Sequence, residues 1–286
     1  MNAAHHATWP TSPASMTDPD ANQAAKKDYK GLLLQGTIAD DYVYATLLSK
    51  HLIPFGYERL HMVALPIYQE NNILHLVTTE TDFLNRGDAD TWDSWFQTAS
   101  ETWDRLKKSK TTFFQQLNHH NKITLQKPQS AYKVLYAASG KNLASCVLDT
   151  SKLSLVIYGR TTQGFIADHK TYWYDTASQE EAHYLCALLN SDVINKAIKG
   201  YQSQGTFGQR DIHRTPFEAC TIPMFDSTNS DHLALAQESI KAHEDLAFIQ
   251  QSKPLKGGVV ALRNLARKQA TAQLKAIEIL TARVVG

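Results

Sequence analysis

The chain changes from short strand-like segments to long helical periodicity at residue 178, and this change constrains the fold more than any other feature. Upstream, paired apolar segments flank turn signals: residues 59–67 and 73–79 around QENN, and residues 133–138 and 143–149 around SGKN. Downstream, Ser178 and Glu181 form an S-x-x-E capping box ahead of a helical pattern. The order predicts an α+β fold with a strand-rich centre and flanking helices.

Four segments have the apolar spacing of helices. They are residues 91–108, 182–199, 231–249 and 259–285. In the first, the tryptophans recur at helical spacing, which favours core packing over base stacking. We expect Gly200 to end the second helix in a left-handed cap. The last segment predicts one long, basic, amphipathic helix at the C-terminus.

Composition bounds the class of protein. Apolar residues make up 43% of the 286 residues and charged residues 20%, which is typical of a soluble globular protein. No apolar run reaches the ~20 residues of a membrane helix, so we expect no membrane partner. Residues 1–28 are rich in Ala, Pro, Ser, Thr and Asp and are predicted to be a disordered leader. Three widely spaced cysteines, with no CxxC pair, indicate a reducing cytoplasm and no zinc site.

The near-zero net charge of +1 conceals two basic segments. Residues 250–286 carry seven Lys and Arg against one acid, and residues 101–140 carry seven against two. Such zones can present a local positive face to a polyanion. They can equally be solvated helix surfaces, so the charge alone does not establish a partner.

Common catalytic motifs are absent. The sequence lacks a P-loop, the dinucleotide fingerprint G-x-G-x-x-G, the elbow G-x-S-x-G and the zinc motif H-E-x-x-H. One weak arrangement remains, because Asp149, Asp168 and Lys170 are the residue types of a Mg²⁺-dependent nuclease. A self-contained nuclease is therefore an alternative function.

A polar loop over residues 205–226, GTFGQRDIHRTPFEACTIPMFD, follows the helix that reads AHYLCALLNSDVINKAIK. Together with the following NSDHLALAQ, these residues resemble the C-terminal target-recognition region of adenine-N6 DNA methyltransferases. They look most like those of type IIG restriction–modification enzymes. LLSKHLIPFGYERLHMVALPI, YAASGKNL and FIADHKTYWYDT look similar as well, so the resemblance covers roughly residues 42–286.

The resemblance implies a division of labour. That family binds S-adenosylmethionine in a separate N-terminal module and holds the flipped adenine with an Asn/Asp-Pro-Pro-Tyr/Phe motif. This sequence has nine prolines but no Pro-Pro pair, and no acidic-x-x-x-Gly-x-Gly motif. We therefore expect no Rossmann methyltransferase module, no cofactor and no catalytic residue in this chain. S-adenosylmethionine is expected in a partner methyltransferase domain or subunit. A fragment, a split gene product and a remnant are all compatible with this pattern.

The expected organisation is a DNA target-recognition domain over residues 29–250, with 29–128 as a candidate sub-region, followed by the basic helix over 251–286. Glutamine reads adenine and arginine reads guanine in the major groove. The predicted DNA-reading residues of the polar loop and its approach are Gln204, Gln209, Arg210, His213 and Arg214. Lys141 and Asn142, in the SGKN turn of residues 139–142, are a second candidate reading element.

A structural alternative stays open for the loop, in which Arg210–Asp211 and Arg214–Glu218 are internal ion pairs. We expect Ile212, Phe217 and Ile222 to anchor the loop to the core. The basic segments supply the candidate phosphate contacts, which are Lys107, Lys108, Lys110, Lys122, Lys127, Lys133, Arg263, Arg267 and Lys268. A third hypothesis makes the C-terminal helix a partner helix of a protein-interaction scaffold.

Overall fold

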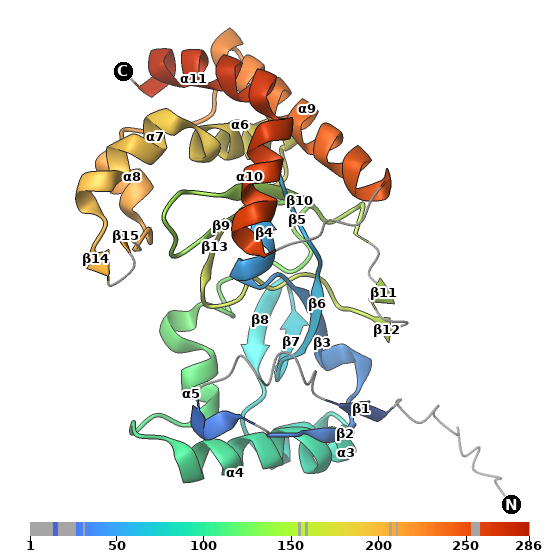
Figure 1. Ribbon diagram of the computed structural model, residues 1–286. Helices are drawn as coiled ribbons and strands as arrows, with labels where there is room; N and C mark the ends of the chain where they lie inside the picture. Colours follow the sequence, from blue (N-terminus) through green and yellow to red (C-terminus); the bar gives the residue numbers. More distant parts are fainter. Residues whose placement is uncertain are drawn as a thin grey trace, which may run out of the picture. The chain divides into compact units, whose positions relative to one another are not determined.

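The computed structural model describes residues 14–16, 27–30, 32–153, 156–157, 160–205, 208–209, 211–252 and 258–285 (Figure 1). The chain divides into two compact units, each built from three chain segments. Unit 1 comprises Met1–Tyr44, Val63–Leu125 and Arg160–Gln163, and unit 2 comprises Ala45–Met62, Gln126–Gly159 and Gly164–Gly286.

Unit 1 contains short strands and a helical layer. Its strands are β1 (Ala14–Met16), β2 (Gln35–Thr37), β7 (Ile67–Glu70), β8 (Ile73–Leu76) and β12 (Arg160–Thr161). Its helices are η1 (Lys27–Tyr29), η2 (Asp40–Tyr42), α2 (Glu80–Asn85), α3 (Ala89–Thr91), η4 (Trp92–Phe96), α4 (Gln97–Leu106), α5 (Phe113–Leu117) and η5 (His119–Asn121). Strands β3 (Val43–Thr46) and β6 (His61–Ala64) run across the division between the units.

A hairpin does form at QENN, but its first strand is β7 and not the predicted strand over residues 59–67, which contains β6 and pairs with β3. Strand β7 pairs antiparallel with β8 from Ile67↔Leu76 to Glu70↔Ile73. Asn71 and Asn72 form the connection with φ of 50° and 63°. Asparagine tolerates this left-handed conformation, and two such residues make the turn whose twist matches a hairpin. The Gln and Glu of QENN therefore extend the strand.

Packed aromatic side chains form the interior of unit 1. Phe83 lies 5.2 Å from Tyr42 and 5.3 Å from Phe96, measured between ring centroids. All three rings are almost fully buried, and Trp95 is also buried. The prediction that the helix expected over residues 91–108 uses its aromatic residues for packing is confirmed. This helix starts with α3 at Ala89, two residues earlier than expected, and passes through the π-helical turn η4 before α4.

Within the predicted leader, Ala14–Met16 is strand β1 and pairs with β2 from Ala14↔Thr37 to Met16↔Gln35. The disordered leader over residues 1–28 stays a prediction, although the backbone of β2 offers residues 14–16 ladder partners. Residues 1–13 and 17–26 of the leader lie outside the described residues.

Unit 2 holds the larger sheet and the long helices. Its strands are β4 (Leu52–Ile53), β5 (Gly56–Tyr57), β9 (Tyr132–Ala137), β10 (Ser145–Asp149), β11 (Val156–Ile157), β13 (Thr171–Thr176), β14 (Gln204–Gly205) and β15 (Gly208–Gln209). Its helices are η3 (Ser49–His51), α6 (Gln179–Asn190), α7 (Asp192–Ala197), η6 (Ile198–Tyr201), α8 (Thr215–Ala219), α9 (Ser230–Ser252), α10 (Val259–Gln269) and α11 (Thr271–Val285).

The central sheet has the order β10–β9–β13 and is antiparallel throughout. Side chains of β9 alternate between two cores: Val134 and Tyr136 pack on the α6 side, and Leu135 packs on the other. Helix α6 packs directly on the first of these faces, and α9 and α11 pack against α6 (Figure 1). The α+β prediction, with a strand-rich centre and flanking helices, is confirmed.

Two predicted helices are interrupted. The helix expected over 182–199 ends at Asn190 and restarts as α7, because Ser191 is extended and accepts a hydrogen bond from the Ile194 amide. Gly200 lies within η6, and it is not among the glycines with positive φ, so its predicted role as a left-handed cap is wrong. The C-terminal helix is divided at Ala270 into α10 and α11.

Candidate nucleic-acid interface

The structure brings the SGKN turn and the polar loop together within unit 2. Ser139 and Asp211 form an isolated antiparallel bridge. The amides of Ile212 and His213 both donate to the Ala138 carbonyl at 3.0 Å. These two segments lie about 70 residues apart in sequence, and each was predicted separately as a reading element.

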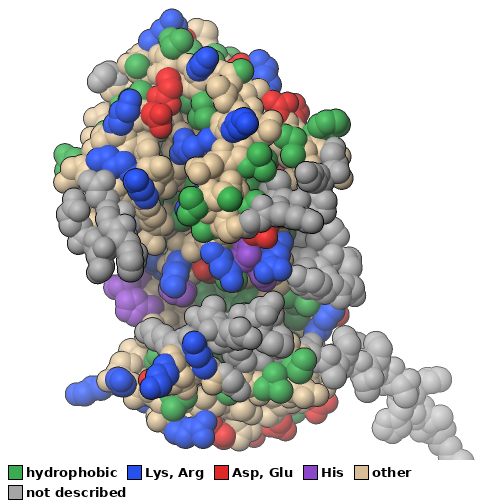
Figure 2. Space-filling model, viewed as in Figure 1, with side chains coloured by type: hydrophobic (Ala, Val, Ile, Leu, Met, Phe, Trp, Pro, Cys, Tyr) green, Lys and Arg blue, Asp and Glu red, His purple; other side chains and the backbone are tan. Residues whose placement is uncertain are grey.

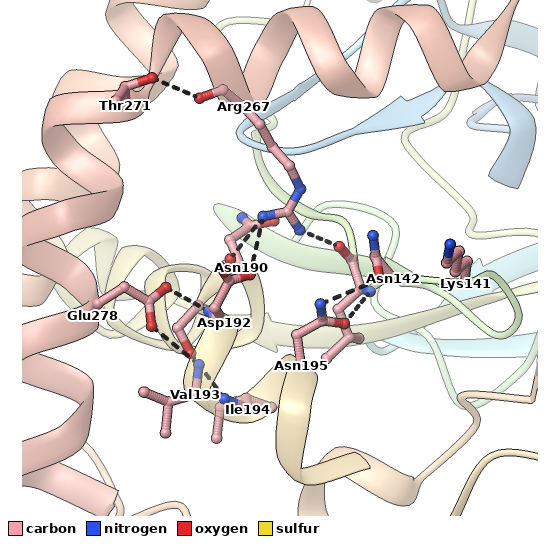
Figure 3. Close-up of polar contacts among 12 residues, drawn as sticks. Lys141, Asn142, Asn190, Asp192, Val193, Ile194, Asn195, Arg267, Thr271 and Glu278 are labelled. Atoms are coloured by element: carbon pink, nitrogen blue, oxygen red, sulfur yellow. Dashed lines mark hydrogen bonds and ion pairs between the residues drawn. The ribbon is translucent and has the colours of Figure 1, made fainter. Parts of the chain in front are cut away.

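Side chains from η6 and α7 support the SGKN turn. The Lys199 ammonium donates to the Lys141 carbonyl, to Asn142 Oδ1 at 3.1 Å and to Gln202 Oε1 at 3.2 Å. Asn195 Nδ2 also donates to Asn142 Oδ1, at 3.3 Å (Figure 3). The side chains of Lys141 and Asn142 remain exposed. The turn therefore presents a lysine and an asparagine to solvent from a fixed backbone.

Lys199 is a functional residue that sequence reasoning missed. Burial lowers its pKa, and the neighbouring cations Lys141 and Arg267 lower it further. Its three acceptors all lie in or next to the SGKN turn, so its part is to position the turn. The signal for it was weak, since a lysine in the last turn of a helix is usually a solvated cap.

The polar loop begins with a small hairpin and ends in a short helix. Gln204 in β14 pairs opposite Gln209 in β15. Arg210 lies outside the described residues, so neither its DNA-reading role nor its pairing with Asp211 is decided. His213 and Arg214 follow, with side chains 57% and 76% exposed. Arg214 Nε lies 3.8 Å from Glu218 Oε1, an exposed pair one helical turn away.

Exposed ion pairs of this kind contribute little, about 0–1 kcal/mol. The Arg214–Glu218 pair therefore leaves the guanidinium available to a ligand. Of the predicted anchors, Ile212 is fully buried and confirmed, and Ile222 is half-buried against the core. Phe217 is 47% exposed, so the prediction that it anchors the loop is wrong.

The predicted phosphate contacts on α10 have different environments. Arg263 donates from Nε to the Leu52 carbonyl at 3.1 Å and from Nη2 to the Ser49 carbonyl at 3.2 Å. Arg267 donates from Nη2 to the Leu143 carbonyl at 2.9 Å (Figure 3). Both guanidinium groups join α10 to neighbouring backbone, whereas Lys268 is exposed. Sequence spacing cannot separate these cases, because all three residues lie on one basic helix.

Lys133 is not a phosphate contact. Its side chain has no exposed surface, and its ammonium pairs with Asp175 and donates to the Lys127 carbonyl at 2.6 Å. Lys107 and Lys108 lie at the end of α4 in unit 1, where Lys107 pairs with Asp104 at 2.6 Å and Lys108 is exposed. Figure 2 shows basic side chains scattered over the visible face of unit 2, with fewer acidic ones among them.

The three residues of the nuclease alternative are not brought together. Asp149 lies opposite Tyr132 at one end of β9, whereas Thr171, just after Asp168 and Lys170, lies opposite Ala137 at the other end. Tyr132 and Ala137 are five residues apart along β9, which corresponds to roughly 16 Å. Asp149 instead accepts hydrogen bonds from Ser151, which lower the pKa of its carboxyl despite partial burial. One Mg²⁺ ion cannot span such a gap with bonds of about 2 Å.

Across the parts of the chain that the structure describes, no cluster of three or more His, Cys, Asp or Glu is arranged to hold a metal ion. No helix among those residues has the length and apolar character needed to cross a bilayer.

Comparison with known proteins adds no family. No protein-family model matches the chain. A search of the curated proteins also finds no match. Functional inference therefore depends on the residues and on the geometry described above.

Proposed function

We propose that this chain is the DNA target-recognition part of an adenine-N6 DNA methyltransferase of a restriction–modification system, and that a partner module supplies the S-adenosylmethionine site and the catalysis. The observation that supports this most is the meeting of the SGKN turn and the polar loop. Lys141, Asn142, His213 and Arg214 are exposed there on segments joined by backbone hydrogen bonds. The resemblance of the loop and its flanks supplies the rest.

The residue types suit duplex DNA. An arginine can bind guanine O6 and N7, which gives about 1–3 kcal/mol of discrimination. Asn142 offers its Nδ2 as a donor to a base edge, because its Oδ1 already accepts from Lys199 and Asn195. A fixed backbone limits the entropy that such side chains lose on binding. Exposed Lys268 and Lys108, in units 2 and 1, are the sequence-independent phosphate contacts of the proposal.

A filter-binding titration of the full chain with mixed-sequence duplexes tests the proposal. We expect binding at low salt, with the logarithm of affinity falling with log salt by about 0.9 for each phosphate contact. Replacing Arg210 and Arg214 together by alanine is expected to weaken binding about tenfold or more. The matched control replaces Lys241 and Lys275, two exposed lysines on α9 and α11, and removes the same charge.

Two results would contradict DNA recognition: no duplex binding, or equal loss of affinity in the arginine and the lysine double variants. The methyltransferase part has its own test. The chain alone is expected to transfer no methyl group from radiolabelled S-adenosylmethionine to DNA. A reading frame beside its gene that encodes the Pro-Pro-Tyr module is expected to restore transfer when both proteins are present.

A further inference from the structure

Four rings gather where the polar loop meets the central sheet. Tyr136 on β9 and Tyr172 on β13 lie directly opposite each other and stack, with centroids 5.1 Å apart and planes at 12°. Phe217 on α8 lies 6.3 Å from Tyr136, and the His213 ring lies 6.2 Å from Tyr172 in an edge-on arrangement. We call these four residues the aromatic cluster.

The cluster passes from the core to the surface. Tyr136 is 4% exposed, and Tyr172 is half-buried. Phe217 is 47% exposed, and the His213 side chain is 57% exposed. Buried rings therefore support exposed ones, an arrangement that fixes an apolar ring at the surface with little freedom to withdraw.

Hydrogen bonds fix the backbone of the cluster in an unfavourable conformation. His213 has φ of +42°, which a residue with a side chain rarely adopts. The Tyr136 hydroxyl donates to the His213 carbonyl at 2.8 Å, and the His213 amide donates to the Ala138 carbonyl. Strain that is held by surrounding structure in this way concentrates at binding sites.

We propose that the aromatic cluster stacks against an unpaired nucleobase of the bound DNA. A paired base hides both faces within the duplex, so a ring that does not wedge between two base steps can stack only on a base that has left the stack. The exposed Arg214 guanidinium follows His213 directly and can pair with the adjoining phosphate. This inference rests on the proposed function and deepens it by assigning a ligand to exposed rings that the reading of paired bases does not use.

Three duplexes of the same mixed sequence provide the test: one fully paired, one with a single bulged adenine and one with a bulged abasic site. The full chain is expected to bind the bulged adenine about tenfold more tightly than the abasic bulge, which has the same backbone distortion without a base. With 2-aminopurine as the bulged base, fluorescence is expected to fall on binding, because stacking quenches it.

Phe217→Ala is expected to abolish this tenfold preference and leave affinity for the fully paired duplex unchanged. Phe217→Trp is expected to retain the preference. Met224→Ala is the matched control, because Met224 is an exposed apolar residue of the same loop, 85% exposed and outside the cluster. Since both side chains are exposed, the variants are expected to unfold at the temperature of the parent chain.

The outcomes separate the two proposals. A preference that is absent in the parent chain, or that survives Phe217→Ala, overturns the stacking inference even when arginine-dependent duplex binding is present. If the chain binds none of the three duplexes, both the proposed function and this inference are wrong.

Discussion

Lys133 and Asp175 form an ion pair inside unit 2, with the lysine fully buried and the aspartate 11% exposed at its side chain. Burial lowers the pKa of Lys133, and Asp175 opposes that shift. Lys133 lies on the central strand β9, so its ammonium cannot reach solvent without disturbing the sheet. A residue that sequence reasoning assigned to DNA therefore has a structural role.

Asp175→Ala is expected to lower the free energy of unfolding by about 3–5 kcal/mol, because it leaves a buried charge without its partner. Urea denaturation monitored by circular dichroism measures this. Lys152→Ala, which removes a lysine 76% exposed and paired with Asp149, is the control and should cost below about 1 kcal/mol. Equal losses of unfolding free energy in the two variants would show that the buried Lys133 pair stabilises the fold no more than an exposed pair does.

His183, which is buried, and His243, which is half-buried, are a second feature at the residue scale, with ring centroids 4.8 Å apart. His243 Nε2 accepts from the Val147 amide at 2.9 Å, while Nδ1 donates to the Ser239 carbonyl at 2.7 Å. This pairing requires a neutral ring. Burial lowers the pKa of His183 to about 2 and that of His243 to about 4.

Stability is therefore expected to be complete above pH 6.5, the usual histidine pKa, and to decrease as the pH falls, since the unfolded chain then binds protons that the fold excludes. At pH 5 the loss is about 2–4 kcal/mol for the pair. Urea midpoints at pH 7, 6 and 5 measure it. His243→Gln should reduce the pH dependence, whereas the exposed His119→Gln should not. A midpoint that does not change with pH would contradict this.

At the scale of elements, the break between α6 and α7 is stabilised by a residue at the break itself and by a residue of α11. Ser191 accepts from the Ile194 amide, and Glu278 of α11 accepts from the amides of Asp192 and Val193 (Figure 3). A carboxylate at the start of a helix satisfies free N–H groups and interacts favourably with the helix dipole. The C-terminal helix thus supplies the N-terminal cap of another helix.

Glu278→Ala is expected to lower stability by about 1–2 kcal/mol, because two amides of α7 lose their acceptor. The thermal midpoint of unfolding, compared with that of Glu238→Ala on α9, measures the difference. Glu238 pairs with the exposed Lys241, so its removal should change the midpoint little. A smaller effect at Glu278 than at Glu238 would contradict a capping role.

Prediction from sequence was most successful where a local signal decides the structure. Ser178 is the N-cap, although the Glu181 half of the predicted capping box does not form because its carboxylate accepts from Tyr174 and Thr176. The turn around SGKN joins β9 to β10. It was less successful where distant residues decide. The break at Ser191 is stabilised from α11, and Phe217 packs at the surface against Tyr136 of β9, about 80 residues earlier in the chain. Neither relation is visible in the periodicity of one segment.

The same limit applies to the candidate site. The residue types of the SGKN turn and the polar loop could be singled out, but their meeting depends on the bridge between Ser139 and Asp211. Basic residues were the hardest to assign, because Arg263, Arg267 and Lys133 look in sequence like solvated cations. Backbone carbonyls and a buried carboxylate, supplied by other elements, give them structural roles.

At the scale of the whole molecule, the C-terminal helices are part of the core of unit 2. Leu262 and Ala266 of α10 pack with Ile53 and Leu246, and Ile277 of α11 is fully buried. Helix α11 packs against α6, α7 and α9. A partner helix, as the scaffold hypothesis has it, would therefore have to bind through the outer face of these helices, where Ile279 and Arg283 are exposed.

Removal of residues 259–286 is therefore expected to abolish cooperative unfolding and any DNA binding together. The core on the α6 side of the sheet would lose Ile277, and the apolar cluster around Ile53 and Leu246 would lose Leu262 and Ala266. Thermal denaturation and dye binding to exposed apolar surface measure the first effect, and the filter assay measures the second. The scaffold hypothesis expects the opposite, a truncated chain that still melts cooperatively and still binds DNA.

The threading of the chain through two units has a consequence for its synthesis. Unit 1 takes its last segment from Arg160–Gln163, whereas unit 2 starts at Ala45 and continues to the end of the chain. On the ribosome, the first unit can close soon after residue 163 emerges. Strands β4 and β5 can meet β10 about 90 residues after they emerge, but their contacts with α9 and α10 must wait for about 200 residues. During that interval the apolar faces of the early strands are targets for chaperones, and a stalled ribosome would release them uncovered.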